Sequence, residues 1–274
     1  MKLIKKAFYL VIPLLLYGNI SLAQKQSEKV SISLDTVRVD GRVAVFVNFS
    51  NMPKQRFVLE IPEIFMLQKI KNGLSNYSNQ QWNFTKTGGN MELTDGQYHY
   101  SINLTKKLGN NSSGLAWKIA VTNNSDSSLY DVSAFNCWTM NTAPLFKDTK
   151  MEKTYVNDIV GKRILLKDVE KTQGNGRRTM QFYPSKNSID LSKTAWLNPW
   201  AVTSPQTLSG NVISVMAKDG SYLFENVVKG EVAYFFNNWE EDHGCIHASP
   251  LIAKELKPGK TKSASGVFQF TKLK

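Results

Sequence analysis

Alternation of apolar and polar residues is the feature that most limits the fold of this 274-residue chain. Apolar side chains occupy every second position in Val30–Leu34, Tyr98–Leu104 and Leu115–Val121, which is the period of a half-buried β-strand. The nearly continuous apolar run Val43–Phe49 is typical of a strand that is covered on both faces. These patterns predict a protein that consists mainly of antiparallel strands.

Further strand segments follow along the chain, and turn-forming pairs such as Asp40-Gly41 and Asp219-Gly220 separate them. Helical signal is confined to two short stretches, Pro62–Lys71 and Ser188–Ala195. We therefore expect an all-β fold, a large antiparallel β-sandwich with very few helices. The chain has no long linker rich in proline or serine, so residues 24–274 are expected to form a single domain. The further strand segments are 164–167, 179–183, 211–217, 231–236 and 266–272.

The N-terminus has the pattern of an export signal. Three lysines precede the apolar stretch Ala7–Tyr17, and Ser21–Ala23 provides small residues at the positions that a signal peptidase reads. The apolar stretch is short and contains Pro13, which argues against a stable membrane anchor. We expect residues 1–23 to be a signal peptide and the protein to be secreted or periplasmic.

The charge balance limits the class of partner. The whole chain carries a formal net charge of +12, and without the three N-terminal lysines 31 basic residues remain against 22 acidic ones. Nearly all of the excess is lysine, whereas proteins that read nucleic acid rely on arginine forks. We expect no nucleic acid partner. A basic exported protein is better suited to an anionic polysaccharide or its oligosaccharides, and the alternative is a surface whose charge only confers solubility.

The segment Asn237–His247 has the highest density of residues that can bind a metal ion or take part in acid-base catalysis. In an extended segment His243, Cys245 and His247 would point to one face, because side chains alternate along a strand. These three residues could bind a divalent metal ion, with Glu240, Asp242 or Cys137 completing the ligand set. No other cofactor is expected.

The same segment has two metal-free interpretations. Either His243 or His247 acts as a general acid or base that Glu240, Glu241 or Asp242 tunes, or the segment is a loop without chemistry. Cys245 also has a competing role. Two cysteines in an exported chain can form a disulfide, here between Cys137 and Cys245, which would remove Cys245 from a metal site.

Tryptophans outside the strand patterns are candidate sugar-binding residues. Trp196 and Trp200 lie in a segment with an Asn-Pro step, and Trp239 follows Asn237 and Asn238. An exposed aromatic ring can stack on the apolar face of a pyranose while amides bind its hydroxyl groups. The alternative is that these rings close the ends of the sandwich.

Two segments resemble known proteins. Residues Trp117–Ser125 resemble the strand that enters the large β-sandwich of galactose-mutarotase-like proteins. The run Cys245–Pro250, followed by Pro258-Gly259 and Gly266–Phe268, is similar to the end of uncharacterised secreted proteins of polysaccharide-degrading bacteria. The resemblance implies a supersandwich fold and a glycan context. The histidine and glutamate that perform mutarotation have no counterpart in these segments, so the resemblance assigns no catalytic residue.

Together these observations predict an exported carbohydrate-interacting protein that binds anionic polysaccharide or its oligosaccharides. One alternative is a polysaccharide lyase or sugar epimerase in which His243 or His247 works with Glu240. Another is an exported metal-binding protein centred on His243, Cys245 and His247.

Overall fold

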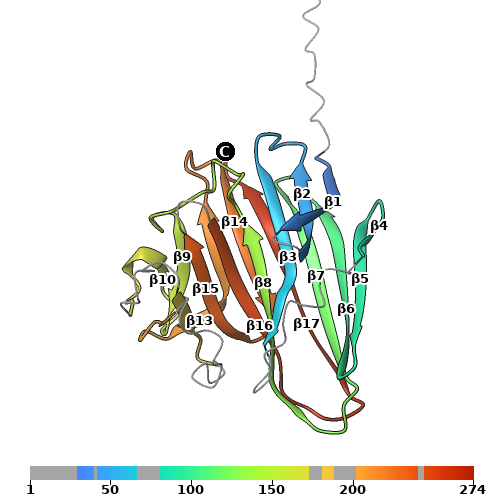
Figure 1. The fold of residues 1–274 in the computed structure, drawn as a ribbon. Helices are drawn as coiled ribbons and strands as arrows, with labels where there is room; N and C mark the ends of the chain where they lie inside the picture. The colour runs from blue at the N-terminus through green and yellow to red at the C-terminus, as the bar shows by residue number, and fades with distance from the viewer. Residues whose placement is uncertain (1–29, 40–41, 67–80, 173–180, 188–201, 240–243) are drawn as a thin grey trace, which may run out of the picture.

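Two large β-sheets lie face to face and enclose the hydrophobic core (Figure 1). The structure is a computed structural model, in which residues 30–39, 42–66, 81–172, 181–187, 202–239 and 244–274 are described. Most of these residues belong to strands. The only helical element among them is a short 3₁₀-helix, η2 (Leu166–Asp168). The expected all-β sandwich is therefore confirmed.

The first sheet has eight strands in the order β1-β2-β3-β8-β16-β15-β11-β12. Its pairings are antiparallel except for that between β11 and β12. Strands from the beginning, middle and end of the chain are neighbours in it. Their bounds are β1 Ile32–Val39, β2 Arg42–Phe49, β3 Arg56–Met66, β8 Leu129–Thr139, β11 Gln181–Pro184, β12 Val202–Thr203, β15 Val232–Trp239 and β16 Gly244–Leu256.

The second sheet has nine strands in the order β10-β9-β13-β14-β17-β7-β6-β5-β4, and all of its pairings are antiparallel. The C-terminal strand β17 lies in its interior, between β14 and β7. The bounds are β4 Asn83–Phe84, β5 Gly88–Asp95, β6 Tyr98–Leu108, β7 Ser112–Asn123, β9 Thr154–Asp158, β10 Arg163–Leu165, β13 Leu208–Met216, β14 Tyr222–Lys229 and β17 Thr261–Lys272.

The alternation in the sequence corresponds to burial in the sandwich. Ile102 and Leu104 on β6 and Trp117 on β7 are buried, whereas Asn103 and Lys118 face solvent. Between the sheets an aromatic cluster surrounds the fully buried ring of Trp138. Its ring centroid lies 4.9 Å from that of Phe268 and 5.0 Å from that of Phe224 on the opposite sheet. These contacts join the two sheets.

The predicted helix at Pro62–Lys71 is wrong over its described part, because β3 continues as a strand to Met66. Pairing with β8 supplies the backbone hydrogen bonds there, and the register shifts between Glu60 and Ile64, around Pro62. A proline at such an irregularity removes no regular ladder bond. The rest of this segment and the predicted helical stretch Ser188–Ala195 lie outside the described residues.

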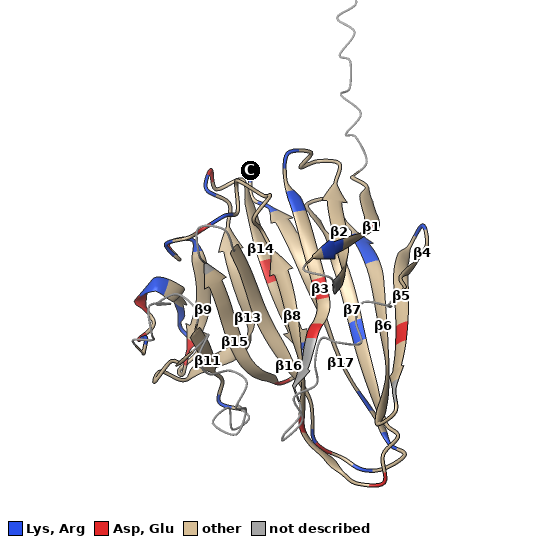
Figure 2. Ribbon diagram, in the orientation of Figure 1, with Lys and Arg blue, Asp and Glu red and all other residues tan. Residues whose placement is uncertain are grey.

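The expected signal peptide, residues 1–23, also lies outside the described residues. In the part of the chain that is described, no helix combines the length and apolarity that crossing a membrane would take. Basic residues are spread over strands and turns of both sheets (Figure 2).

Candidate functional site

The outer face of the eight-stranded sheet, turned away from the sandwich core, carries a row of reactive side chains. Glu60 on β3 is paired with Cys137 on β8. The register between β8 and β16 pairs Ile246 with Trp138, which brings His247 opposite Cys137. Since Trp138 and Ile246 belong to the core, their chain neighbours Cys137 and His247 point to the outer face. Three strands that are distant in sequence thus align a carboxylate, a thiol and an imidazole.

Aromatic rings continue this row. His247 is paired with Phe236 on β15, which in turn is paired with Phe182 on β11. The imidazole stacks on Phe135 with 4.0 Å between ring centroids, and it meets the Phe236 ring edge-on at 5.1 Å. The row therefore has a polar half next to an aromatic half.

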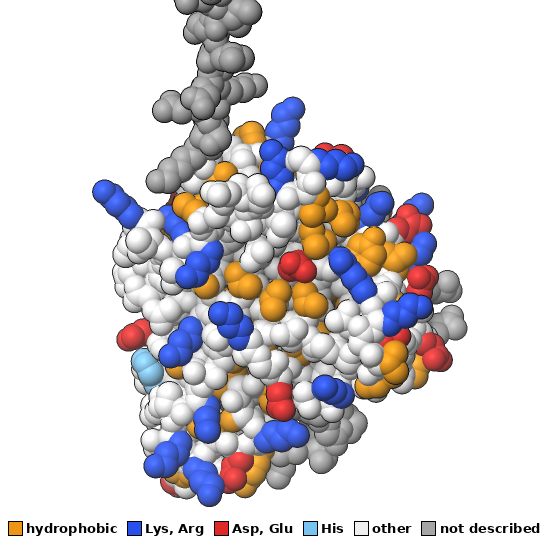
Figure 3. All heavy atoms as spheres, turned by 180° about the vertical axis from the view of Figure 1, so that it is seen from behind, with side chains coloured by type: hydrophobic (Ala, Val, Ile, Leu, Met, Phe, Trp, Pro, Cys, Tyr) orange, Lys and Arg blue, Asp and Glu red, His pale blue; other side chains and the backbone are white. Residues whose placement is uncertain are grey.

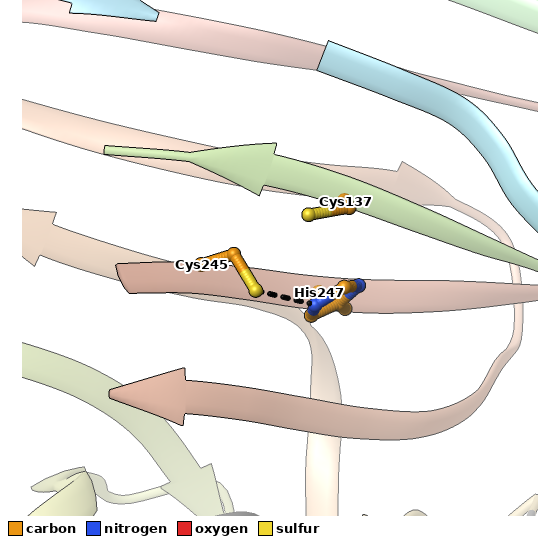
Figure 4. A group of neighbouring side chains, drawn as sticks. All are labelled: Cys137, Cys245 and His247. Carbon is orange, nitrogen blue, oxygen red and sulfur yellow. Dashed lines mark hydrogen bonds between the residues drawn. The ribbon is translucent and has the colours of Figure 1, made fainter. Parts of the chain in front are cut away.

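The environment of His247 keeps its imidazole neutral. The side chain is 0% exposed, and burial lowers its pKa to about 3, with only a partial opposing effect from the backbone of Asn136. Its Nε2 lies 3.2 Å from Cys245 Sγ (Figure 4). Its Nδ1 is buried and forms no hydrogen bond of good geometry. A neutral imidazole can act as a metal ligand, but it lacks the second, acidic N–H proton of the imidazolium ion that a general acid donates.

The two thiols lie beside this imidazole. Both cysteines are buried and no disulfide joins them, and Cys137 Sγ lies 3.3 Å from Thr139 Oγ1. A hydrogen bond with Cys245, burial, and the charges of Glu63 and Glu60 raise the pKa of Cys137 well above its ordinary value. Cys245 and His247 point to the same face, because they lie two residues apart in the regular strand β16.

One potential ligand atom from each of Cys137, Cys245 and His247 lies within 4.8 Å of the others. A second group with the same spacing consists of Glu60, Glu63 and Cys137. We call the five residues of these two groups the Cys-His-Glu cluster. Glu60 and Glu63 were not among the residues predicted from sequence, because nothing in their local pattern indicates which strand lies next to β3.

Several predicted site residues lie outside the described part of the chain, namely Trp196, Trp200, Glu240 and His243. Trp239 ends β15, where it pairs with Gly244. The predicted contact of Asn237 with a sugar is not supported, because this side chain is fully buried and its Nδ2 donates to Met151 Sδ at 3.4 Å. Asn238, the next residue, is partly exposed.

A polar pocket lies at one end of the sandwich, near the start of β7 and the end of β17. It has a volume of about 570 Å³, within the range of sites for small molecules. We call it the end pocket. Amides, hydroxyl groups and one ammonium group dominate its lining, which comprises Val30, Asn51, Gly109, Asn110, Asn111, Ser112, Ser113, Tyr222, Phe270 and Lys272.

Strand pairing positions the polar groups of the end pocket. Lys272 N donates to Asn111 O at 2.8 Å, which ties the end of β17 to the turn between β6 and β7. Asn51 Nδ2 donates to Tyr222 Oη at 3.2 Å. Phe270 is 1% exposed and belongs to the core, so the pocket is closed toward the interior by a ring that neighbouring aromatic residues hold.

Comparison with known proteins gives only distant likenesses. No family model matches the chain, and no curated protein matches its sequence. A protein from Synechocystis sp. PCC 6803 has a TM-score of 0.47 at 10% identity, covering 88% of this chain and 96% of that one. A candidate aldose 1-epimerase from Escherichia coli K12 has a TM-score of 0.42 at 10% identity, covering 89% and 100%. A galactose mutarotase related enzyme from Lactobacillus acidophilus has a TM-score of 0.42 at 12% identity, covering 88% and 98%.

Proposed function

We propose that this protein is an exported carbohydrate-interacting protein that binds anionic polysaccharide or its oligosaccharides in the end pocket. The observation that carries the proposal is the lining of this pocket, which includes three asparagines together with Tyr222 and Lys272. Amides donate and accept hydrogen bonds, as the hydroxyl groups of a sugar do. Lys272 supplies a positive charge for the carboxylate of a uronic acid.

The net charge supports an anionic ligand. Basic side chains are spread over the outer face of the nine-stranded sheet, with fewer acidic ones among them (Figure 3). The strand register there aligns two amides, a hydroxyl group and two ammonium groups across five neighbouring strands, a track along which an extended anionic chain could lie. The row comprises Asn90, Asn103, Lys118, Ser265 and Lys229.

The N-terminal sequence supports a location outside the cytoplasm. A positive segment, an apolar stretch and small residues before Gln24 follow one another in the order that export requires. We propose a secreted or periplasmic protein, in which the end pocket would meet extracellular glycans.

Binding to uronic acid oligosaccharides and to neutral oligosaccharides of matched length tests this function. We expect the protein to prefer the uronates, and Lys272→Gln to weaken uronate binding about 10- to 100-fold, the value of one charge-assisted hydrogen bond. Binding of neutral sugars should change little. Lys254→Gln is the matched control, because Lys254 is an exposed lysine on β16 and does not line the pocket. Equal weakening in both variants, or no binding by the wild type, would contradict the proposal.

Incubating the protein with the same oligosaccharides and analysing the products tests the alternative of a lyase or epimerase. New reducing ends, unsaturated uronates or epimerised sugars would reveal turnover. Full burial and the lowered pKa of His247 favour binding over acid-base catalysis by this residue. Turnover that His247→Gln abolishes would therefore replace the binding proposal with an enzymatic one.

A further inference from the structure

We propose that the Cys-His-Glu cluster binds one zinc ion through Cys137, Cys245, His247 and Glu60. The site would lie on the outer face of the eight-stranded sheet, across β3, β8 and β16. It is separate from the end pocket and does not depend on the carbohydrate proposal. The metal set predicted from sequence shares Cys245 and His247 with this one and offered Cys137 as a completing ligand, whereas Glu60, on β3, is added by the structure.

The strand register places the ligand atoms of Cys137, Cys245 and His247 in one group, and that of Glu60 beside Cys137. Glu60, Cys137 and His247 occupy paired positions on three neighbouring strands, and Cys245 lies two residues before His247 on the same face. Figure 4 shows the Cys137 and Cys245 side chains and the imidazole of His247 close to one another on β8 and β16. Ligands fixed by sheet pairing are held by many backbone hydrogen bonds, so the donor set is largely formed before a metal binds.

The separations suit a tetrahedral zinc ion. Zn–S bonds near 2.3 Å and Zn–N bonds near 2.0 Å place two sulfurs about 3.8 Å apart, and a sulfur and a nitrogen about 3.5 Å apart. Cys245 Sγ and His247 Nε2 are 3.2 Å apart, and the ligand atoms of Cys137, Cys245 and His247 all lie within 4.8 Å of one another. Small side-chain rotations would bring these atoms into coordination.

The chemistry of the donors selects the metal. Two thiolates and an imidazole favour zinc or other thiophilic ions, whereas calcium and magnesium require oxygen ligands. Glu60 is 4% exposed, and one of its carboxylate oxygens lies within 4.8 Å of the Cys137 sulfur, so a carboxylate borders the Cys137 thiol from the β3 side. A fourth ligand of this kind suits zinc, which accepts nitrogen, sulfur and oxygen donors.

Strand geometry also favours a bridging ion over a disulfide. Cys245 is paired with Thr139, so Cys137 and Cys245 occupy diagonal rather than opposite positions on adjacent strands. Diagonal neighbours are farther apart than the Cβ–Cβ distance of about 3.8 Å that a disulfide requires. A metal ion spans the larger separation, because it adds two bond lengths between the sulfurs.

Metal analysis of the purified full chain tests the proposal. Protein prepared without chelators, or dialysed against zinc and then buffer, should hold about one zinc per chain. Substitution with Co²⁺ should produce the visible bands of a tetrahedral ion and a thiolate-to-cobalt charge-transfer band. Cys245→Ser and His247→Gln should lose the metal, whereas Ser249→Ala should keep it. Ser249 is the matched control, because it is fully buried on the same strand and face.

The cobalt spectrum of the wild-type protein keeps the test decisive where a ligand variant fails to fold, because the charge-transfer band itself reports thiolate ligation. Three results with the wild-type protein would overturn the proposal. These are a wild-type protein that holds no zinc after loading, a cobalt complex without thiolate bands, and a Cys137–Cys245 disulfide detected by mass analysis of the unreduced protein. Metal that both ligand variants retain would also overturn it, since the ion would then lie elsewhere.

Discussion

Tyr183 couples the stability of the fold to alkaline pH. This residue of β11 is fully buried, its hydroxyl group makes no hydrogen bond, and burial raises its pKa well above the ordinary value. In the unfolded chain a tyrosine ionises near pH 10, whereas in the folded protein Tyr183 remains neutral. The stability linked to this group is therefore complete below about pH 10 and decreases as the pH rises above it.

We expect the free energy of unfolding to decrease by about 1.4 kcal/mol per pH unit above pH 10 for each such tyrosine. Tyr183→Phe should reduce this slope and leave stability at pH 7 unchanged or higher, because it removes an unsatisfied buried hydroxyl group. Urea unfolding at a series of pH values measures both effects. Tyr130→Phe is the control, since Tyr130 is 47% exposed. An unchanged slope in Tyr183→Phe would contradict this account.

Asp148 organises the turn before β9. Its Oδ2 accepts hydrogen bonds from Lys153 N and Thr154 Oγ1, both at 2.8 Å, and its Oδ1 accepts one from Glu152 N at 3.1 Å. Because an asparagine has only one acceptor oxygen, Asp148→Asn should leave at least one donor unsatisfied. We expect a loss of about 1–3 kcal/mol in urea unfolding. Asp126→Asn, on an exposed loop residue, should change stability little. Equal effects in the two variants would show that these bonds contribute nothing.

At the scale of elements, the close approach of β7 and β17 depends on Gly114. A Cβ at this position would lie 2.0 Å from the carbonyl oxygen of Phe268, which is backbone and cannot rotate away. We expect Gly114→Ala to destabilise the protein by about 1–3 kcal/mol, because the two strands must separate locally. Thermal or urea unfolding measures this loss.

Gly96→Ala is the matched control for that substitution. Gly96 lies between β5 and β6, and a Cβ there would meet nothing within 4 Å. Its effect should stay within about 0.5 kcal/mol. A Gly114→Ala variant as stable as Gly96→Ala would mean that the β7–β17 pairing tolerates a wider spacing.

At the scale of the whole molecule, the C-terminal strand closes the nine-stranded sheet. β17 pairs along its length with both β14 and β7, and it contributes Phe268 and Phe270 to the aromatic core. A chain that ends at Lys260 would expose two strand edges and remove these rings. We expect it to lose the cooperative unfolding transition and the near-ultraviolet circular dichroism of packed aromatic residues.

A chain that lacks only Lys274 is the control for this truncation, because it keeps all of β17. It should unfold like the full chain. A cooperative transition in the chain that ends at Lys260 would contradict the role of β17 as an interior strand, and would indicate that β7 and β14 are stable without it.

The sequence by itself determined the fold class and much of the strand content. Period-two alternation needs only local information, because successive side chains of any strand point to opposite faces. It therefore predicted the strands that contain Ile102, Trp117 and Ile213, and the buried position of Trp117. The pattern failed at Pro62–Lys71, where a local helical signal yielded to the backbone hydrogen bonds that β8 supplies.

The tertiary structure alone decided which reactive residues meet. The sequence placed Cys245 near His247, but pairing of β8 with β16 brought Cys137 to them, and pairing of β3 with β8 brought Glu60 to Cys137. The end pocket likewise combines Asn51, Asn111 and Tyr222, which are far apart in the chain. Strand order and register depend on the packing of both sheets against a common core, and no local pattern encodes that choice.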